Sequence, residues 1–416
     1  MIVGIDLGTT NSLVGVYQDG QIKLIPNAFG EYLTPSVVAL DDNDEIIVGK
    51  IAKERLVTHP DKTVSQFKRF MGTKHELTLG NRAYKAEELS SFIIRKLVDD
   101  AETYLGEKVE EVIVSVPAYF NDAQRYATKL AGKFAGVQID RIINEPSAAA
   151  LAKRSMVNQE DQSFIVVDFG GGTLDISVVE LFDNIVEIVS IAGDNRLGGE
   201  DFTAAIAEEF LVSNQLTKDT ISREFYSKIL VQAEKTKLEL NDKEEVKMTV
   251  MDQDQEYSLD LSYQRFYELC QPLLARVKAV LDRALMDARY SYVSSDNFVL
   301  VGGTSKLRLV QDFLSYCINQ MVQVSDDPDR MIARGCAILA GIKERQGEIR
   351  DLLLSDICPF TLGIEIVGDR FSPIIERNST LPASRIEHYY TAELGQSQVK
   401  IKVYQGEMMK ASQNLF

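Results

Sequence analysis

The stretch that most constrains the fold is FIVVDFGGGTLDISVVEL, residues 164–181, in which two runs of β-branched and apolar residues flank three consecutive glycines. Asp168 and Asp175 stand on either side of the turn. Glycines weaken the end of a strand, so three together indicate a further requirement, such as a close approach of the backbone to a phosphate. A plain hairpin is the alternative, although its usual turn is Asn-Gly or Asp-Gly. The hairpin is therefore a candidate phosphate site.

The N-terminus repeats this pattern. IVGIDLGTTNSLVGVYQ, residues 2–18, leads from a strand through Asp6, Gly8, Thr9 and Thr10 into a second strand. In the second copy the turn consists of Gly170, Gly171, Gly172 and Thr173. Two such turns can close on one ligand from opposite sides, which predicts duplicated halves with a cleft between them. A chance likeness of two glycine-rich turns is the alternative.

Two further glycine pairs precede helices. Gly302 and Gly303 follow the strand NFVLV, and Gly198 and Gly199 lead into a helix that opens with two acidic residues. A glycine pair at the N-terminus of a helix is well suited to binding an anion. Neither GxxxxGK[ST] nor GxGxxG occurs in the chain, so the expected site is neither a P-loop nor a Rossmann dinucleotide site.

Between the two hairpins, strands alternate with helices, which indicates an α/β domain. Residues 85–105 carry a helical stripe of apolar residues, and Asn121 is placed to cap the next helix. Glu145 lies at a strand-to-helix corner, with Pro146 in the first turn of the helix. The Glu145 carboxylate can interact with the helix dipole or, in a cleft, orient a water molecule.

Composition limits the partners of this chain. Its 416 residues leave room for two or three domains, and its net charge of −17 argues against nucleic acid or an anionic membrane as a main partner. The N-terminus enters a strand at once, so we expect no signal peptide, and no apolar run reaches the length of a membrane span. The cysteines are far apart and form no CxxC pair, which favours a cytoplasmic protein with reduced thiols. The three histidines predict no zinc site.

A resemblance to a known family rests on seven stretches, namely IVGIDLGTTNSLVGV, SVPAYFNDAQRYATKLAGKFAG, RIINEPSAAALA, VVDFGGGTLDIS, AGDNRLGGEDF, AEKTKLEL and VLVGGTSKL. Together and in this order they resemble the ATPase domain of the seventy-kilodalton heat-shock chaperones, over most of residues 1–346. Within that family, IPNAFGEYLTPSVVAL, ICPFTLGIEI and FSPIIERNSTLPASR look most like the specialised bacterial HscC-type members.

The resemblance implies an actin-like α/β fold of two lobes with duplicated subdomains, which close on ATP or ADP. It implies that Asp6 and Asp168 bind Mg2+, mostly through its waters. Lys68 would place a positive charge on the γ-phosphoryl group, whereas without the resemblance it reads as a solvated helix lysine. Glu145 and Asp175 would orient the attacking water. The implied phosphate contacts are Gly8, Thr9, Thr10, Gly170, Gly171, Gly172, Thr173, Gly198 and Gly199.

The adenosine part of the nucleotide would lie further out. The implied contacts are Glu234, Lys237, Asn241, Gly302, Gly303, Lys306 and Asp329. Family members often carry serine where this chain has Asn241, and arginine where it has Lys306. Arginine stacks flat on a base, whereas lysine presents a point charge, so these departures bear on affinity for the base rather than on the phosphate chemistry.

The C-terminal part resembles a linker followed by a second domain. Residues 347–356 contain the run DLLL, which by itself is typical of a buried strand and which matches the hydrophobic interdomain linker of these chaperones. Residues 357–416 resemble the start of their β-sandwich peptide-binding domain, without a helical lid, and QVKIKVYQG alternates as a strand does. A sandwich cut partway leaves unpaired edges, so we expect it to be irregular or completed by another molecule.

Three functions remain open at this point. The first is a cytoplasmic chaperone that hydrolyses ATP slowly, signals through the linker, and works with unfolded peptides, a J-domain co-chaperone and a nucleotide-exchange factor. The second is a small-molecule (sugar) kinase on the same scaffold, and the third is a filament-forming actin relative. The DLLL run followed by ICPFTLGIEI favours the chaperone, because neither alternative needs these segments.

Overall fold

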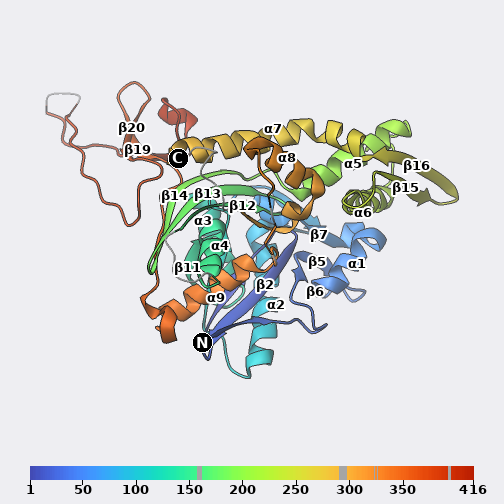
Figure 1. The fold of residues 1–416 in the computed structure, drawn as a ribbon, viewed down its shortest axis with the longest axis horizontal. Helices are drawn as coiled ribbons and strands as arrows, with labels where there is room; N and C mark the ends of the chain where they lie inside the picture. The colour runs from blue at the N-terminus through green and yellow to red at the C-terminus, as the bar shows by residue number, and fades with distance from the viewer. Residues whose placement is uncertain (157–161, 290–297, 323, 326, 392–394) are drawn as a thin grey trace.

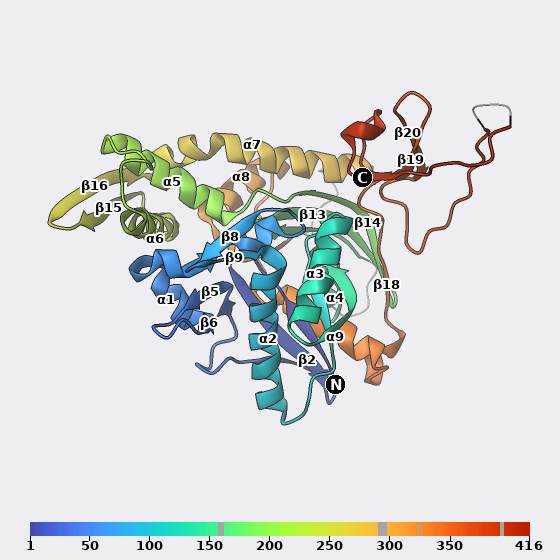
Figure 2. The same cartoon turned by 180° about the vertical axis from the view of Figure 1, so that it is seen from behind.

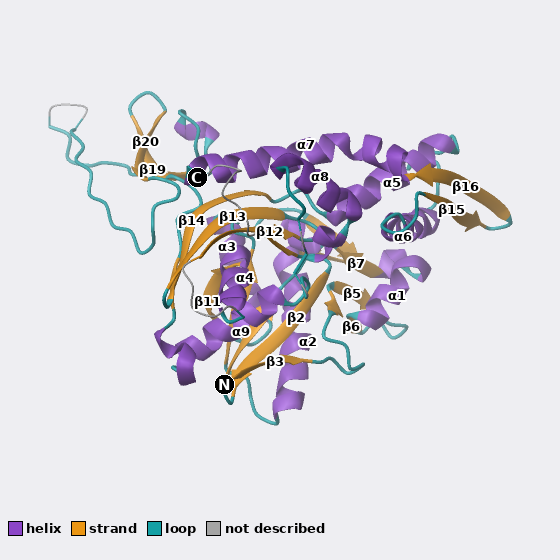
Figure 3. Cartoon of the chain, in the orientation of Figure 1, coloured by secondary structure: helices purple, strands orange, loops and turns teal. Residues whose placement is uncertain are grey.

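The structure is a computed structural model that describes residues 1–156, 162–289, 298–322, 324–325, 327–391 and 395–416. Two twisted sheets lie at the centres of two lobes, with helices between and outside them (Figure 1). Helices and strands alternate along the chain until a C-terminal extension that consists mostly of loops (Figure 3).

The sheet of the first lobe has the order β11-β10-β1-β2-β3. β1, β2 and β3 form an antiparallel meander, whereas β10 and β11 run parallel to β1. The bounds are β1 (Ile2–Asp6), β2 (Asn11–Gln18), β3 (Gln21–Ile25), β10 (Glu111–Val116) and β11 (Gln138–Asn144), with the short β4 (Thr34–Pro35) paired to β2. β1 and β2 are the first glycine-turn hairpin of the sequence.

The sheet of the second lobe repeats this plan in the order β17-β12-β13-β14-β18. β12, β13 and β14 form the antiparallel meander, and β17 runs parallel to β12 as β10 does to β1. A parallel bridge from Leu300 to Val324 lies where the first sheet has β11. The bounds are β12 (Gln162–Phe169), β13 (Leu174–Phe182), β14 (Ile185–Asp194), β17 (Phe298–Val301) and β18 (Leu353–Ser355). The expected duplication is thus confirmed.

Helices cover both faces of each sheet. α4 (Glu145–Arg154) and α9 (Met331–Lys343) pack between the sheets, where α9 contacts β1 and β2, and α4 contacts β12 and β13. The outer helices are α2 (Ala86–Leu105) and α3 (Asp122–Phe134) in the first lobe, and α5 (Gly199–Ser213) and α7 (Tyr263–Ala288) in the second. Apolar residues accordingly form one core between the sheets and one outside each sheet. Among the described residues, no helix is long and apolar enough to cross a membrane.

Each lobe carries an outer subdomain. That of the first lobe consists of β5 (Val37–Leu40), β6 (Ile46–Val48), α1 (Lys50–Thr58), η1 (Pro60–Lys62), β7 (Thr63–Ser65), η2 (Phe67–Phe70), β8 (Glu76–Leu79) and β9 (Arg82–Lys85). That of the second lobe consists of α6 (Arg223–Glu239), β15 (Glu245–Asp252) and β16 (Gln255–Ser262), whereas η4 (Gly303–Lys306) contacts β12 and α8 (Arg308–Ile318) contacts α7. α1 contacts α6 across the space between the lobes.

The C-terminal part begins with η5 (Gly347–Asp351) and then β18, which runs beside β14 at the edge of the second sheet (Figure 2). In residues 357–416, called here the C-terminal module, a small antiparallel sheet has the order β20-β19-β21. Its elements are β19 (Leu362–Ile366), β20 (Arg370–Ile375), β21 (Val403–Gln405) and η6 (Ala411–Gln413). The strand expected over residues 398–406 is wrong in its first half, because Val399 and Ile401 are exposed and only β21 pairs.

Candidate active site

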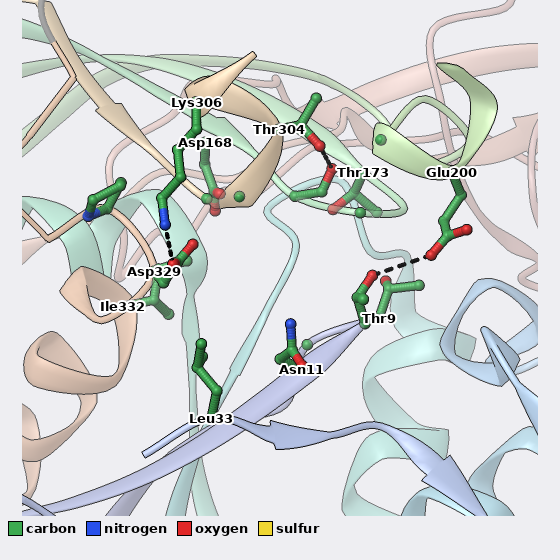
Figure 4. A pocket seen from close by; sticks show the side chains of 18 of the residues that line it. Thr9, Asn11, Leu33, Asp168, Thr173, Glu200, Thr304, Lys306, Asp329 and Ile332 are labelled. Atoms are coloured by element: carbon green, nitrogen blue, oxygen red, sulfur yellow. Dashed lines mark hydrogen bonds and ion pairs between the residues drawn. The ribbon is translucent and has the colours of Figure 1, made fainter. Parts of the chain in front are cut away.

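A cavity of about 350 Å³ lies between the lobes, at the turns of the two glycine hairpins. Figure 4 shows Thr9 and Asn11 of the first lobe facing Asp168 and Thr173 of the second. Of the residues expected at the site, those that line the cavity are Asp6, Gly8, Thr9, Thr10, Lys68, Glu145, Asp168, Gly170, Gly171, Thr173, Gly199, Glu234, Lys237, Gly302, Gly303, Lys306 and Asp329. The others, which lie outside the lining, are Gly172, Asp175, Gly198 and Asn241.

The glycines allow the turns of the two lobes to touch. A Cβ atom on Gly171 would lie 2.0 Å from Thr10 Oγ1, and one on Gly172 would lie 2.6 Å from Thr9 Oγ1. A Cβ atom on Gly198 would lie 2.3 Å from the Gly171 backbone. Contacts this short do not occur in proteins, so any side chain here would push the turns apart. This explains the glycine-rich hairpin of the sequence, because three backbone segments meet where a phosphate could bind.

Asp6 is the last residue of β1 and Asp168 the last but one of β12; both line the cavity and both are buried. Asp6 Oδ1 accepts a hydrogen bond from Ser115 Oγ at 3.0 Å, whereas Asp168 Oδ2 has no partner among the described residues. Burial and the nearby Glu145 charge raise the pKa of Asp6 to about 7, and the same causes raise that of Asp168 well above its ordinary value. Buried carboxylates with an unpaired oxygen suit a divalent cation.

These two aspartates could hold Mg2+ only together with other ligands. Within the described residues, no three His, Cys, Asp or Glu side chains gather closely enough to hold a metal. Mg2+ keeps several waters and is commonly bound by one or two carboxylates together with substrate phosphates. The donor set therefore fits a magnesium ion that reaches the site with a nucleotide.

Lys68 and Glu145 form a buried ion pair at the same end. Lys68 Nζ lies 2.7 Å from Glu145 Oε1, and the two side chains are 5% and 7% exposed. Lys68 Nζ also lies 5.7 Å from the centre of the Phe120 ring. The reading of Lys68 as a solvated lysine is thus wrong. Since both residues line the cavity, a positive charge and a carboxylate lie side by side at the end formed by the glycine turns, called here the phosphate end.

Asp175 lies just behind this pair. It is buried opposite Asp168 in the β12–β13 hairpin, and its Oδ2 accepts a hydrogen bond from the Ala118 amide at 3.2 Å. Burial, followed by the Glu145 charge, raises the pKa of Asp175 to about 8. Asp175 Oδ1 has no partner among the described residues. Its role in orienting a water stays a prediction.

The outer end of the cavity combines ion pairs with apolar side chains. Lys237 Nζ lies 2.6 Å from Glu234 Oε2, and Lys306 pairs with Asp329, as Figure 4 shows. Apolar lining comes from Leu33, Leu238, Leu307, Pro328 and Ile332. Asn241 lies outside the lining, and its Oδ1 accepts a hydrogen bond from the Arg308 amide at the start of α8. Its contact with a nucleotide stays a prediction.

Several residues at the cavity were not expected from the sequence. Thr304 donates a hydrogen bond to the Gly170 carbonyl at 2.8 Å, and Glu200 lines the cavity beside Thr10. Both directly follow a glycine pair, which is the signal that could have found them. Ser115 and Arg69 have no such signal, because a serine in a strand and an arginine in a short turn are common everywhere.

Comparison with known proteins places this chain in a family. The Hsp70 protein family matches residues 2–415. The chain is 40% identical over 433 residues to the chaperone protein DnaK of Thermotoga neapolitana and, equally, to that of Thermotoga maritima. Each alignment covers 100% of this chain and 72% of the relative.

Two duplicated lobes that close on a cavity lined by glycine turns, a buried lysine and paired aspartates define an actin-like ATPase. The chain belongs to the Hsp70 family, the ATP-hydrolysing molecular chaperones. This membership disfavours the sugar-kinase and filament alternatives.

Proposed function

We propose that the cavity between the lobes hydrolyses Mg-ATP with the residues named above, and that the chain couples this reaction to peptide binding. The observation that carries the proposal is the convergence of both Asp-Gly-Thr turns and the Lys68–Glu145 pair on one cavity. Asp6 and Asp168 would hold Mg2+, which when bound supplies positive charge to the phosphate oxygens. Backbone amides and threonine hydroxyls of the turns would bind the phosphates.

The remaining chemistry is positioning and charge stabilisation. The Lys68 ammonium would offset charge that develops on the transferred phosphoryl group, where low local dielectric makes it effective. Glu145 would accept a hydrogen bond from the attacking water and orient it in line with the departing ADP. Because Glu145 already holds Lys68 Nζ at 2.7 Å, one contact sets the positions of both groups. Asp175 would hold the water from the side of the second lobe.

We propose residues 347–356 as the linker. They contact the core between the sheets and the start of α4, the helix that carries Glu145. Leu352 and Leu354 pack against the core between the sheets, and Leu353 N donates to the Asn184 carbonyl at 2.8 Å. Asp356 Oδ2 accepts hydrogen bonds from Asn144 Nδ2 at 3.0 Å and Ser147 Oγ at 2.9 Å. Asn144 directly precedes Glu145, so a displaced linker would change the contacts at the start of the helix that carries the water-orienting carboxylate.

The C-terminal module would be the peptide-binding part, following an ATPase domain of residues 1–346. Its Phe360 ring packs edge-on against Tyr119, with ring centres 4.8 Å apart, and Arg377 pairs with Asp287 of α7 at 2.6 Å. We propose that this docked arrangement belongs to the ATP-bound protein. We also propose that the chain binds unfolded peptides as clients and works with a J-domain co-chaperone and a nucleotide-exchange factor.

The four cysteines are all free, which supports work in the cytoplasm. The likeness to HscC-type members stays a prediction.

A calorimetric and kinetic experiment tests the proposed site. Asp6→Asn and Asp168→Asn should each weaken binding of Mg-ADP much more than binding of ADP in EDTA, because the lost partner belongs to the shell of the metal. Wild-type protein should release phosphate from ATP without any sugar present. Equal losses with and without Mg2+ would contradict the metal assignment, and phosphate release that depends on an added sugar would restore the kinase reading.

A further inference from the structure

Four side chains join the two lobes beside the phosphate end of the cavity. The Arg69 guanidinium donates to Asp201 Oδ1 at 3.2 Å and to Asp201 Oδ2 at 2.6 Å, and Gln66 Nε2 donates to Glu200 Oε2 at 2.6 Å. We call these residues, Gln66, Arg69, Glu200 and Asp201, the interlobe clasp. A forked guanidinium–carboxylate pair is strong and fixes orientation as well as distance.

The clasp holds the short turn that carries Lys68. This turn, η2, directly follows Gln66, whose backbone is left-handed with φ of 58°. Such a conformation is unfavourable for a residue other than glycine and persists only where the surroundings fix it. Gln66 on one side of Lys68 and Arg69 on the other both bond to the start of α5. The turn is therefore fixed at both ends by the second lobe.

The same carboxylate also touches a phosphate turn. Asp201 Oδ2 accepts a hydrogen bond from the Gly198 amide at 2.7 Å, in addition to its bond from Arg69. Glu200 likewise accepts a hydrogen bond from Thr10 Oγ1 at 3.4 Å. The first lobe also holds Lys68, through Glu145, the Phe120 ring and the packing of η2 against α2. The distance from Lys68 to a phosphate bound by the second lobe thus depends on the relative orientation of the two lobes. The interlobe clasp fixes that orientation beside the cavity.

We propose that the Arg69–Asp201 pair positions Lys68 over the γ-phosphoryl group, so that lobe closure rather than nucleotide binding makes the site competent for hydrolysis. The inference rests on the proposed function, in which the Lys68 charge acts on the γ-phosphoryl group. It adds that the contact between the lobes places Lys68 there. Arg69 and Asp201 are positioning residues, because they act through Lys68 and the Gly198 turn.

The test compares binding with chemistry in Arg69→Met. Its single-turnover hydrolysis rate should fall roughly ten- to a hundredfold, because small misplacements of a catalytic group have effects of this size. Its affinity for Mg-ADP should change by less than about threefold, since no direct phosphate donor is lost. Arg69→Lys, which keeps the charge but not the fork, should recover part of the rate. Free guanidinium ion should recover part of the rate of Arg69→Ala.

Two controls make the outcome decisive. Arg223 and Asp61 join the same lobes at the exposed rim, 2.8 Å apart, so Arg223→Met should leave the rate within about twofold. Asp201→Asn combined with Arg69→Met should lose less rate than the product of the two single losses, because both variants break the Arg69–Asp201 contact, while Arg69 also bonds to the Gly171 carbonyl and Asp201 to the Gly198 amide. An Arg69→Met rate within about twofold of wild type, or parallel losses of rate, affinity and melting temperature, would overturn the proposal. Absence of hydrolysis by the wild type would instead refute the proposed function.

Discussion

At the residue scale, the Lys68–Glu145 pair decides how the site should respond to mutation. Both side chains are almost fully buried, so removing one leaves the other as an unpaired charge in the interior. That loss costs about 3–5 kcal/mol in other proteins, whereas replacing both partners with neutral groups is often tolerated. A single variant therefore mixes a stability effect with a catalytic one, and the double variant separates them.

Lys68→Met should reduce single-turnover ATP hydrolysis by about a hundredfold or more, while Mg-ADP affinity changes by only a fewfold. The reason is that its charge serves the developing phosphate charge rather than the bound ground state. The double variant Lys68→Met with Glu145→Gln should regain the melting temperature that the single variant loses, yet remain inactive. A double variant that recovers hydrolysis together with stability would remove Lys68 from the mechanism.

Asp175 gives the nucleotide-free protein a dependence on pH. Its pKa is raised from 3.8 to about 8 by burial, so the folded chain keeps a proton that the unfolded chain releases near pH 4. The folded state thus binds more protons between these values, and its free energy of unfolding falls as pH rises. The melting temperature should therefore fall between about pH 4 and about pH 8, level off above that, and fall less in Asp175→Asn. Identical slopes for both proteins would show that Asp175 is ionised in the folded chain.

At the element scale, the two hairpins with their Asp-Gly-Thr turns could be predicted from the sequence, because a glycine turn between β-branched runs is a local signal. The duplicated lobes and the helix capped by Asn121 follow in the same way. The Lys68–Glu145 contact could not be predicted from local pattern, since 77 residues separate its partners. Only the family resemblance brought them together, and neither route indicated the clasp of Arg69 with Asp201.

The DLLL run carries two sequence interpretations: a buried strand, which the structure confirms in part, and an interdomain linker, which stays a proposal. Leu353 and Leu354 of the DLLL run begin the strand β18, as their apolar character predicts, and the run leads on to the C-terminal module. Leu352, just before β18, and Leu354 pack against the core between the sheets, whereas Leu353 is 61% exposed. Residues 398–402 do not form a strand, and in the part of the chain that the structure describes their apolar side chains, Val399 and Ile401, stay exposed. A strand needs a partner surface as well as a pattern.

Leu354→Asp should therefore detach β18 from β14, since burying a leucine fully is worth roughly 1.5–3 kcal/mol and a charge removes that gain. Hydrogen exchange at the Leu353 amide, which bonds to Asn184, should become much faster. Leu353→Asp is the matched control, because its side chain faces solvent, and it should leave exchange nearly unchanged. ATP should slow this exchange more than ADP does in the wild type. Equal exchange in ATP, ADP and nucleotide-free protein would mean that the linker does not sense the nucleotide.

At the scale of the whole molecule, the C-terminal module is held to the ATPase lobes by polar and aromatic pairs and by the burial of Ile357. Arg377 pairs with Asp287 of α7, Phe360 packs on Tyr119, and β18 joins the second sheet at the edge of β14. Such a contact between domains is expected to open and close, because relative domain motion is usual unless the contact is large and apolar. A nucleotide can shift that equilibrium only by binding the docked and undocked forms differently.

The Arg377–Asp287 pair offers the sharpest test of docking. The Asp287 side chain is only 8% exposed, so Arg377→Glu places two carboxylates together in a site largely closed to water. The module should undock in ATP, which small-angle scattering would register as a larger radius of gyration. The reversed pair, Arg377→Glu with Asp287→Arg, should restore the compact form. Lys402→Glu is the matched control, because Lys402 pairs with Glu365 inside the module at 2.6 Å. If Lys402→Glu expands the molecule as much as Arg377→Glu does, net charge rather than this contact governs docking.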